Sequence, residues 1–188
     1  MQKRTLISPA GYEPQAVATR TLASQLDPLL EALTARVKDA SVAELEWQLR
    51  PGVNTPGMLL AHLALAETYW MQMVGRDVES PEEWDRIALE VTGLRMDGDG
   101  MPLPPHGRHP ATLAGKTAGD YLEMLRRARE ATHATLCGWG DHELEQTHTV
   151  DGREVSRAWI LFHVVEHFAQ HLGQIALLAS IRRGAGGG

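Results

Sequence analysis

Cysteine and long apolar runs are scarce in this sequence of 188 residues. Its one cysteine, Cys137, excludes an internal disulfide and a cysteine-rich zinc site. No apolar run approaches the roughly 20 residues that span a bilayer. The N-terminal residues also lack the apolar stretch of a signal peptide. We therefore expect a cytoplasmic protein with no membrane partner.

An excess of basic residues is also absent, and this excludes another class of partner. Lys and Arg number 18 against 24 Asp and Glu, a formal net charge of −6. A nucleic-acid-binding domain would carry a basic patch or stripe, so we expect no nucleic-acid partner. The P-loop, the dinucleotide-binding glycine motif and the G-x-S-x-G motif do not occur either. Cys137 has no activating neighbours in the sequence, which argues against a cysteine nucleophile.

Helical periodicity is present over most of the chain. Apolar residues recur at three- and four-residue steps, as on one face of a helix. Long helices are predicted for residues 14–39, 55–74, 117–136 and 156–183, with shorter ones at 41–47 and 80–91. The pair Asp27–Pro28 indicates that the first is either kinked or split into two helices. Four long amphipathic helices predict an all-α protein built as an antiparallel four-helix bundle.

Capping and breaking residues define the limits of these segments. Residues 92–116 are rich in Gly and Pro and predict a long connection between the second and third long helices. The pair Asp151–Gly152 predicts a small hairpin over 147–156. We expect residues 1–183 to form one domain, followed by a flexible glycine-rich tail at 184–188. Helix starts are predicted at Ser41, Thr55, Ser80, Thr117 and Ser156.

Histidines at helical spacing are the strongest functional signal. His163, His167 and His171 are four residues apart, so their side chains share one helix face. His62 lies in the apolar segment MLLAHLALA of the second long helix, where its face should be buried. Imidazoles facing a core are costly unless something satisfies them, and neutral imidazole is the commonest metal ligand. His62, His167 and His171 therefore form a candidate three-ligand site with positions open to water or substrate.

Each candidate also has a structural interpretation. His62 alone is typical of a satisfied core histidine, and His163 is either a ligand, a core residue or a support for the ligands. Glu166 is either a carboxylate at the edge of the bundle or a group that assists the site. The other candidates for lining or supporting the site are Glu67, Tyr69, Gln170 and Gln174, and each could instead be structural.

Two segments resemble a known family. NTPGMLLAHLALAETYW is similar to the second helix of the DinB-like (DinB/YfiT) superfamily, and EVSRAWILFHVVEHFAQHLGQIALL is similar to its last helix. The family pattern of the last helix is matched by His167, His171, Gly173 and Gln174. The resemblance implies a four-helix bundle whose metal is held by His62, His167 and His171. It also implies a homodimer that binds zinc or nickel, with manganese or iron as alternatives.

Known members of that family suggest the chemistry. Some are S-transferases or isomerases that use a low-molecular-weight thiol, and others are described as hydrolases. The resemblance therefore implies a thiol S-transferase acting on a small-molecule substrate, with a metal-dependent hydrolase as the alternative. A non-catalytic metal- or ligand-binding bundle that responds to stress is a further hypothesis. Arg95, Arg108 and Arg153 are candidates for binding an anionic thiol, or are ordinary surface residues.

Overall fold

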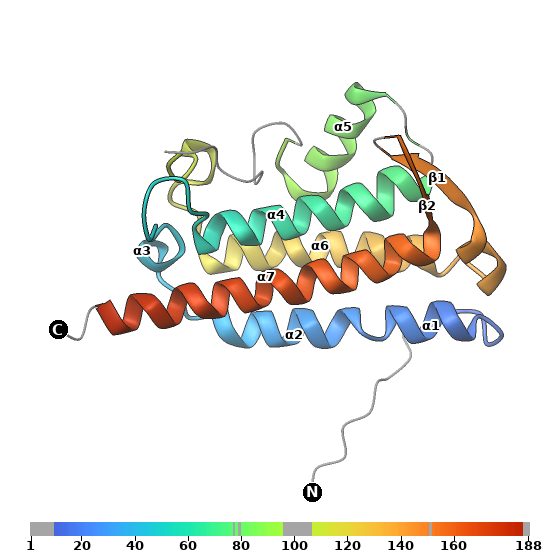
Figure 1. The fold of residues 1–188 in the computed structure, drawn as a ribbon, viewed down its shortest axis with the longest axis horizontal. Helices are drawn as coiled ribbons and strands as arrows, with labels where there is room; N and C mark the ends of the chain where they lie inside the picture. The colour runs from blue at the N-terminus through green and yellow to red at the C-terminus, as the bar shows by residue number, and fades with distance from the viewer. Residues whose placement is uncertain (1–9, 77, 79, 96–106, 151, 186–188) are drawn as a thin grey trace, which may run out of the picture.

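The computed structural model describes residues 10–76, 78, 80–95, 107–150 and 152–185, and this part of the chain is mostly helical (Figure 1). The prediction of a chiefly α-helical protein is therefore confirmed. A two-stranded antiparallel hairpin is added at the place predicted for it. The α-helices are α1 (Val17–Ala23), α2 (Leu26–Val37), α3 (Val42–Leu45), α4 (Pro56–Thr68), α5 (Pro81–Thr92), α6 (Ala118–Leu136) and α7 (Arg157–Ala185). The strands are β1 (Thr147–Val150) and β2 (Arg153–Ser156).

Several helices begin where the sequence predicted. The hydroxyl of Thr55 accepts a hydrogen bond from the backbone N–H of Met58 at the start of α4. Thr117 and Asp120 form a capping box at the start of α6. The first long segment is split, because α1 ends at Ala23 and α2 begins at Leu26. The expected cap, Asp27, therefore lies within the first turn of α2, where carboxylates are favoured by the helix dipole.

Four helical runs lie side by side, namely α1 with α2, α4, α6 and α7 (Figure 1). The helices α4 and α7 are antiparallel, since Arg157 at the start of α7 donates to the carbonyl of Gly75 beyond the end of α4. The helices α4 and α6 run in the same direction, because Tyr121 faces Gly57 and Arg129 faces Glu67. The predicted antiparallel arrangement is therefore wrong for this pair.

The long connection explains this parallel pair. After α5 ends at Thr92, the chain returns to the start of α4, where the carbonyl of Gly107 accepts from the N–H of Gly52. The return allows α6 to set off in the direction of α4. Residues 96–106 of the predicted connection lie outside the described residues, and Ala111–Leu113 form a short 3₁₀ turn.

At the other end of the chain, α7 is longer than expected. It continues through Gly184 to Ala185, so Gly184 does not end the helix. Residues 186–188 of the predicted tail lie outside the described residues.

The helix α4 lies at the centre of the core and is buried on almost every side. A helix that is apolar all round is expected to be interior, so its few polar side chains stand out. They include His62, half-buried, and Glu67, which is 2% exposed. Directly after α4, Tyr69–Met73 form a π-helical turn in which the N–H of Val74 reaches back to the carbonyl of Tyr69. Among the described residues, no helix has both the length and the apolar character that crossing a membrane requires.

Candidate metal centre

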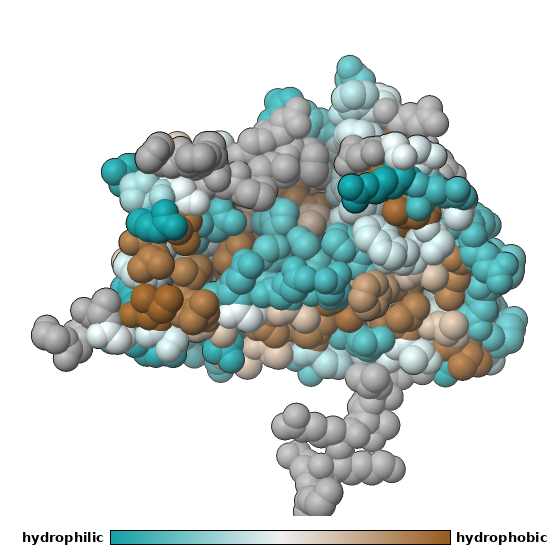
Figure 2. Space-filling view, viewed as in Figure 1, coloured by the Kyte–Doolittle hydropathy of each residue, from teal (hydrophilic) through white to brown (hydrophobic). Residues whose placement is uncertain are grey.

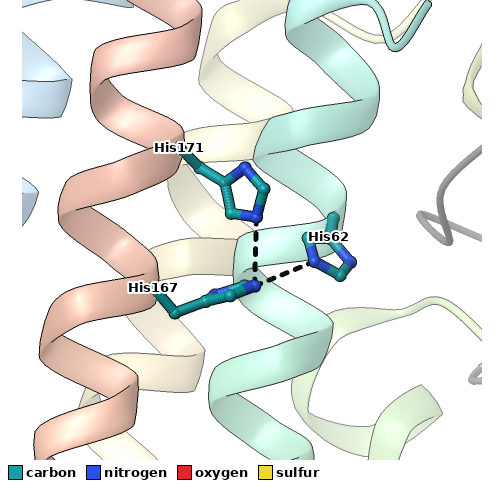
Figure 3. A group of neighbouring side chains, drawn as sticks. All are labelled: His62, His167 and His171. Carbon is teal, nitrogen blue, oxygen red and sulfur yellow. Dashed lines mark hydrogen bonds between the residues drawn. The ribbon is translucent and has the colours of Figure 1, made fainter.

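Three histidines from two helices meet at the surface between α4 and α7 (Figure 3). The Nε2 atom of His167 lies 3.0 Å from Nε2 of His62 and 3.0 Å from Nε2 of His171. One ring nitrogen from each residue lies within 4.8 Å of the others. The sequence prediction that His62, His167 and His171 come together is therefore met in the structure. We call these three residues the His triad.

Local helix geometry explains the arrangement. His167 and His171 are one turn apart on α7, so both side chains extend from the same face. Because α4 and α7 are antiparallel and in contact, His62 meets that face from the opposite side. All three side chains are half-buried, so the site is accessible from one side.

The surroundings of His167 favour its neutral imidazole form. Burial lowers the pKa of His167 to about 3, and the neighbouring His171, His62 and His163 add to the effect. A neutral imidazole keeps a lone pair on one ring nitrogen, which is the form that binds metals. Three nitrogen atoms that converge at hydrogen-bonding distance cannot all be satisfied by the protons they share. A divalent cation satisfies all of them, so the donor set of the triad can hold a divalent metal ion.

Gln174 holds one ligand in orientation. Its side-chain oxygen lies 2.8 Å from Nδ1 of His171, so Nδ1 donates a proton to it. The Nε2 atom of His171 then carries the lone pair and points toward His167. Hydrogen bonding of the second ring nitrogen is the usual way in which proteins orient metal-binding histidines. Of the predicted supporting residues, Gln174 therefore forms a hydrogen bond with a member of the triad.

His163 lies beside the triad but does not join it. Its ring is 5.6 Å from the ring of His167, and it stacks on Trp159 at 4.8 Å with an interplanar angle of 6°. Its Nδ1 atom is 3.6 Å from a carboxylate oxygen of Glu166. The other oxygen of Glu166 accepts from the amide of exposed Gln170 at 2.6 Å. Glu166 and Gln170 thus form a surface pair on the helix edge next to His163.

Glu67 does not line this site. Both of its oxygens accept hydrogen bonds from Arg129 of α6, at 2.8 and 3.1 Å, in the interior of the protein. Burial lowers the pKa of Arg129, but the charge of Glu67 and its hydrogen bonds outweigh that effect and raise the pKa overall. The guanidinium also lies 5.2 Å from the ring centre of Phe168. The structural interpretation of Glu67 is the one that the geometry supports.

The structure also has a cavity beside His163, and of its lining residues only His163 and Arg153 were candidates from the sequence. It has a volume of about 390 Å³. Trp70 lines it from the π-helical turn after α4, and no sequence pattern predicted that turn. The ring of Tyr69 packs against the rings of Trp70 and Trp84. The cavity is lined by Trp70, Val150, Arg153, Val155, Trp159 and His163.

The other two candidate arginines have different settings. Arg95 forms an ion pair with Asp85 at 2.6 Å. Arg108 is exposed. Arg153 is thus the one of the three that lines the cavity beside the triad.

The comparison with protein families agrees with this geometry. The model described as DinB superfamily matches residues 25–175. The match includes α4, which carries His62, and the part of α7 that carries His167 and His171. Comparison with curated proteins gives no match.

Proposed function

This chain belongs to the DinB superfamily, and from that premise we propose that it is a metal-dependent enzyme whose ion is held by His62, His167 and His171. The observation that carries the proposal is the convergence of three Nε2 atoms from two helices. Three protein ligands leave coordination positions for a small molecule, as in catalytic rather than structural sites. Imidazole ligands suit zinc and nickel, which we propose as the bound metals ahead of manganese and iron.

We further propose the reaction class as transfer of a low-molecular-weight thiol to a small electrophile. A divalent ion in such a site supplies Lewis acidity, which lowers the pKa of a thiol or water molecule that it binds. The protein brings the three imidazoles together and orients His171 through Gln174. It also provides a cavity beside the triad whose lining is largely aromatic and apolar. Hydrolysis needs the same three ligands, so the co-substrate distinguishes the two reactions.

The metal content of the purified protein tests the site. The protein is purified without a metal-affinity column and analysed by elemental mass spectrometry. About one metal ion per chain is expected, and His167→Ala should lose it. His142→Ala is the matched control, because His142 is exposed and lies outside the triad. A protein that holds no metal and takes up no added zinc, nickel or manganese would refute the proposal.

Turnover with different co-substrates tests the reaction class. The metal-loaded protein is mixed with a panel of thiols and a reactive small electrophile, and loss of free thiol is followed. Consumption that depends on both the thiol and the His triad is expected. If no thiol is consumed but an ester or amide substrate is cleaved, the enzyme is a hydrolase instead.

We also propose that two copies of the chain associate. Hydrophobic residues gather near the C-terminal end of α7, visible as the brown area at the left of Figure 2. Leu49 and Leu177 are 46% and 60% exposed, and both border a groove with Ile181. Contiguous exposed apolar surface of this kind marks interaction sites. Light scattering should give a dimer mass that Leu177→Asp converts to a monomer mass, and a monomeric wild type would contradict the proposal.

A further inference from the structure

The cavity beside His163 has two walls of different origin. One wall consists of aromatic rings, with Trp70 from the π-helical turn and Trp159 and His163 from α7. The other is the hairpin, which contributes Val150, Arg153 and Val155 (Figure 1). Its volume of about 390 Å³ is in the range of sites for small organic molecules.

The register of the hairpin explains why the guanidinium group of an arginine lies among apolar side chains. Val150 pairs with Arg153 across the two strands, so the two side chains are on the same face. Val155 is two residues after Arg153, and alternate residues of a strand share a face. The hairpin therefore presents two valines and one guanidinium together toward the cavity.

The aromatic wall is built for flat groups. The ring centre of Trp70 lies 5.6 Å from that of Trp159 and 5.1 Å from that of His163. In both pairs the ring planes are nearly perpendicular. Trp159 is 41% exposed although it is large and apolar, and its stacked partner is His163. An exposed tryptophan at the rim of a cavity is typical of a surface that contacts a ligand.

The position of the cavity relates it to the His triad. His163 lines the cavity, and its ring is 5.6 Å from that of His167. A molecule in the cavity is therefore one imidazole away from the triad. Among the described residues three side chains form the triad, so a metal ion there would keep positions for a group that extends from the cavity past His163.

We propose that this cavity binds the electrophilic substrate, and that the substrate is a flat, aromatic or unsaturated carboxylate. Identifying this ligand as the substrate rests on the proposed function, whereas its binding to the cavity does not require the metal. The ring of the ligand lies against Trp70 and Trp159, and its carboxylate pairs with Arg153. The planar guanidinium matches a carboxylate with two parallel hydrogen bonds, which selects anions of that shape.

Tryptophan fluorescence of the full-length protein tests the proposal, with benzoate as the probe. The chelator-treated protein is excited at the red edge of tryptophan absorption, where benzoate does not absorb. Acetate and benzyl alcohol serve as probes that keep only the charge or only the ring. Benzoate should give a saturable change, and both control probes should bind at least about tenfold more weakly, since each lacks one of the two contacts. The chain has five tryptophans, so Trp159→Phe is used to locate the signal and should remove most of it.

Arg153→Gln is the deciding variant. It should weaken benzoate binding by about tenfold and leave benzyl alcohol binding unchanged, because only the charge-assisted contact is lost. Arg108→Gln is the matched control, since it removes an exposed arginine that does not line the cavity, and it should change neither. Benzyl alcohol binding as tightly as benzoate would overturn the assignment of an anionic ligand.

Other outcomes separate this proposal from the metal site. If benzoate binds only the metal-loaded protein and Arg153→Gln has no effect, the carboxylate binds the metal and the cavity proposal is wrong. If no probe changes the fluorescence, the proposal is also wrong. Benzoate binding that depends on Arg153 in a protein that takes up no metal would leave the binding site standing and refute the proposed enzyme.

Discussion

Replacing Arg129 with methionine should lower the unfolding free energy by about 3–5 kcal/mol, the usual cost of removing one partner from a buried ion pair. The structure shows that this ion pair is almost completely buried. The side chains of Arg129 and Glu67 are 4% and 1% exposed. Two hydrogen bonds join them, and Arg129→Met would leave the carboxylate of Glu67 without either. Asp27 cannot take the place of the guanidinium, since it is itself acidic.

A double-mutant cycle gives the magnitude. The variant Arg129→Met/Glu67→Leu removes both charges and fills the space with apolar groups. It should recover most of the stability that Arg129→Met loses, so the coupling energy should exceed about 2 kcal/mol. Urea denaturation followed by circular dichroism measures all four proteins. The folded double variant should bind as much metal as the wild type, because the pair joins α4 to α6 and neither residue belongs to the His triad.

The matched control is Arg126→Met on the same helix. Arg126 is 52% exposed and pairs with Glu123 and Glu130 on the surface, so its loss should cost at most about 0.5 kcal/mol. If Arg129→Met costs no more than Arg126→Met, the burial argument is refuted. If the double variant loses the sum of the two single losses, the two residues do not act as a pair.

Three further predictions concern other parts of the molecule. The metal-free protein should lose stability as the pH falls below about 6.5. His167 of the unfolded chain then binds a proton, whereas His167 of the folded chain does not. In the folded protein burial and the neighbouring imidazoles hold the pKa of His167 near 3. The urea concentration at the unfolding midpoint should therefore decrease as the pH is lowered from about 7 to about 5. An equally large decrease in His167→Gln would contradict this assignment. Gly57→Ala should cost about 1–3 kcal/mol, because its Cβ would lie 2.7 Å from the hydroxyl oxygen of Tyr121, and an unchanged melting temperature would rule the clash out. Thr117→Ala should cost about 1 kcal/mol by removing the cap of α6, measured by urea denaturation, whereas Thr117→Ser should retain most of it.

The His triad could be predicted because its signals are local. His167 and His171 share a face through helix geometry alone, and the apolar residues around His62 predict that it is interior. The helix starts at Thr55 and Thr117 were predictable for the same reason, since a cap needs only neighbouring residues.

Features that depend on distant residues could not be predicted in this way. The helix α4 is apolar on all sides, so periodicity does not say which neighbour Glu67 faces, and its partner Arg129 is 62 residues away. The parallel course of α4 and α6 depends on how the connection between them returns. The cavity likewise needs the hairpin and α7 to meet, which no segment encodes alone.

The π-helical turn has a consequence for how this protein could change over time. Its hydrogen bonds span five residues instead of four, so the turn shifts the angular position of the side chains that come after it. Trp70 on this turn and His62 on α4 therefore belong to one continuous stretch of chain, yet their orientations are set separately. An insertion or deletion at Tyr69–Met73 would change the position of Trp70 in the aromatic wall without moving His62 on α4. Selectivity for the ligand could then diverge among related proteins while the metal ligands stay the same, and sequence comparisons should look for length changes at this position.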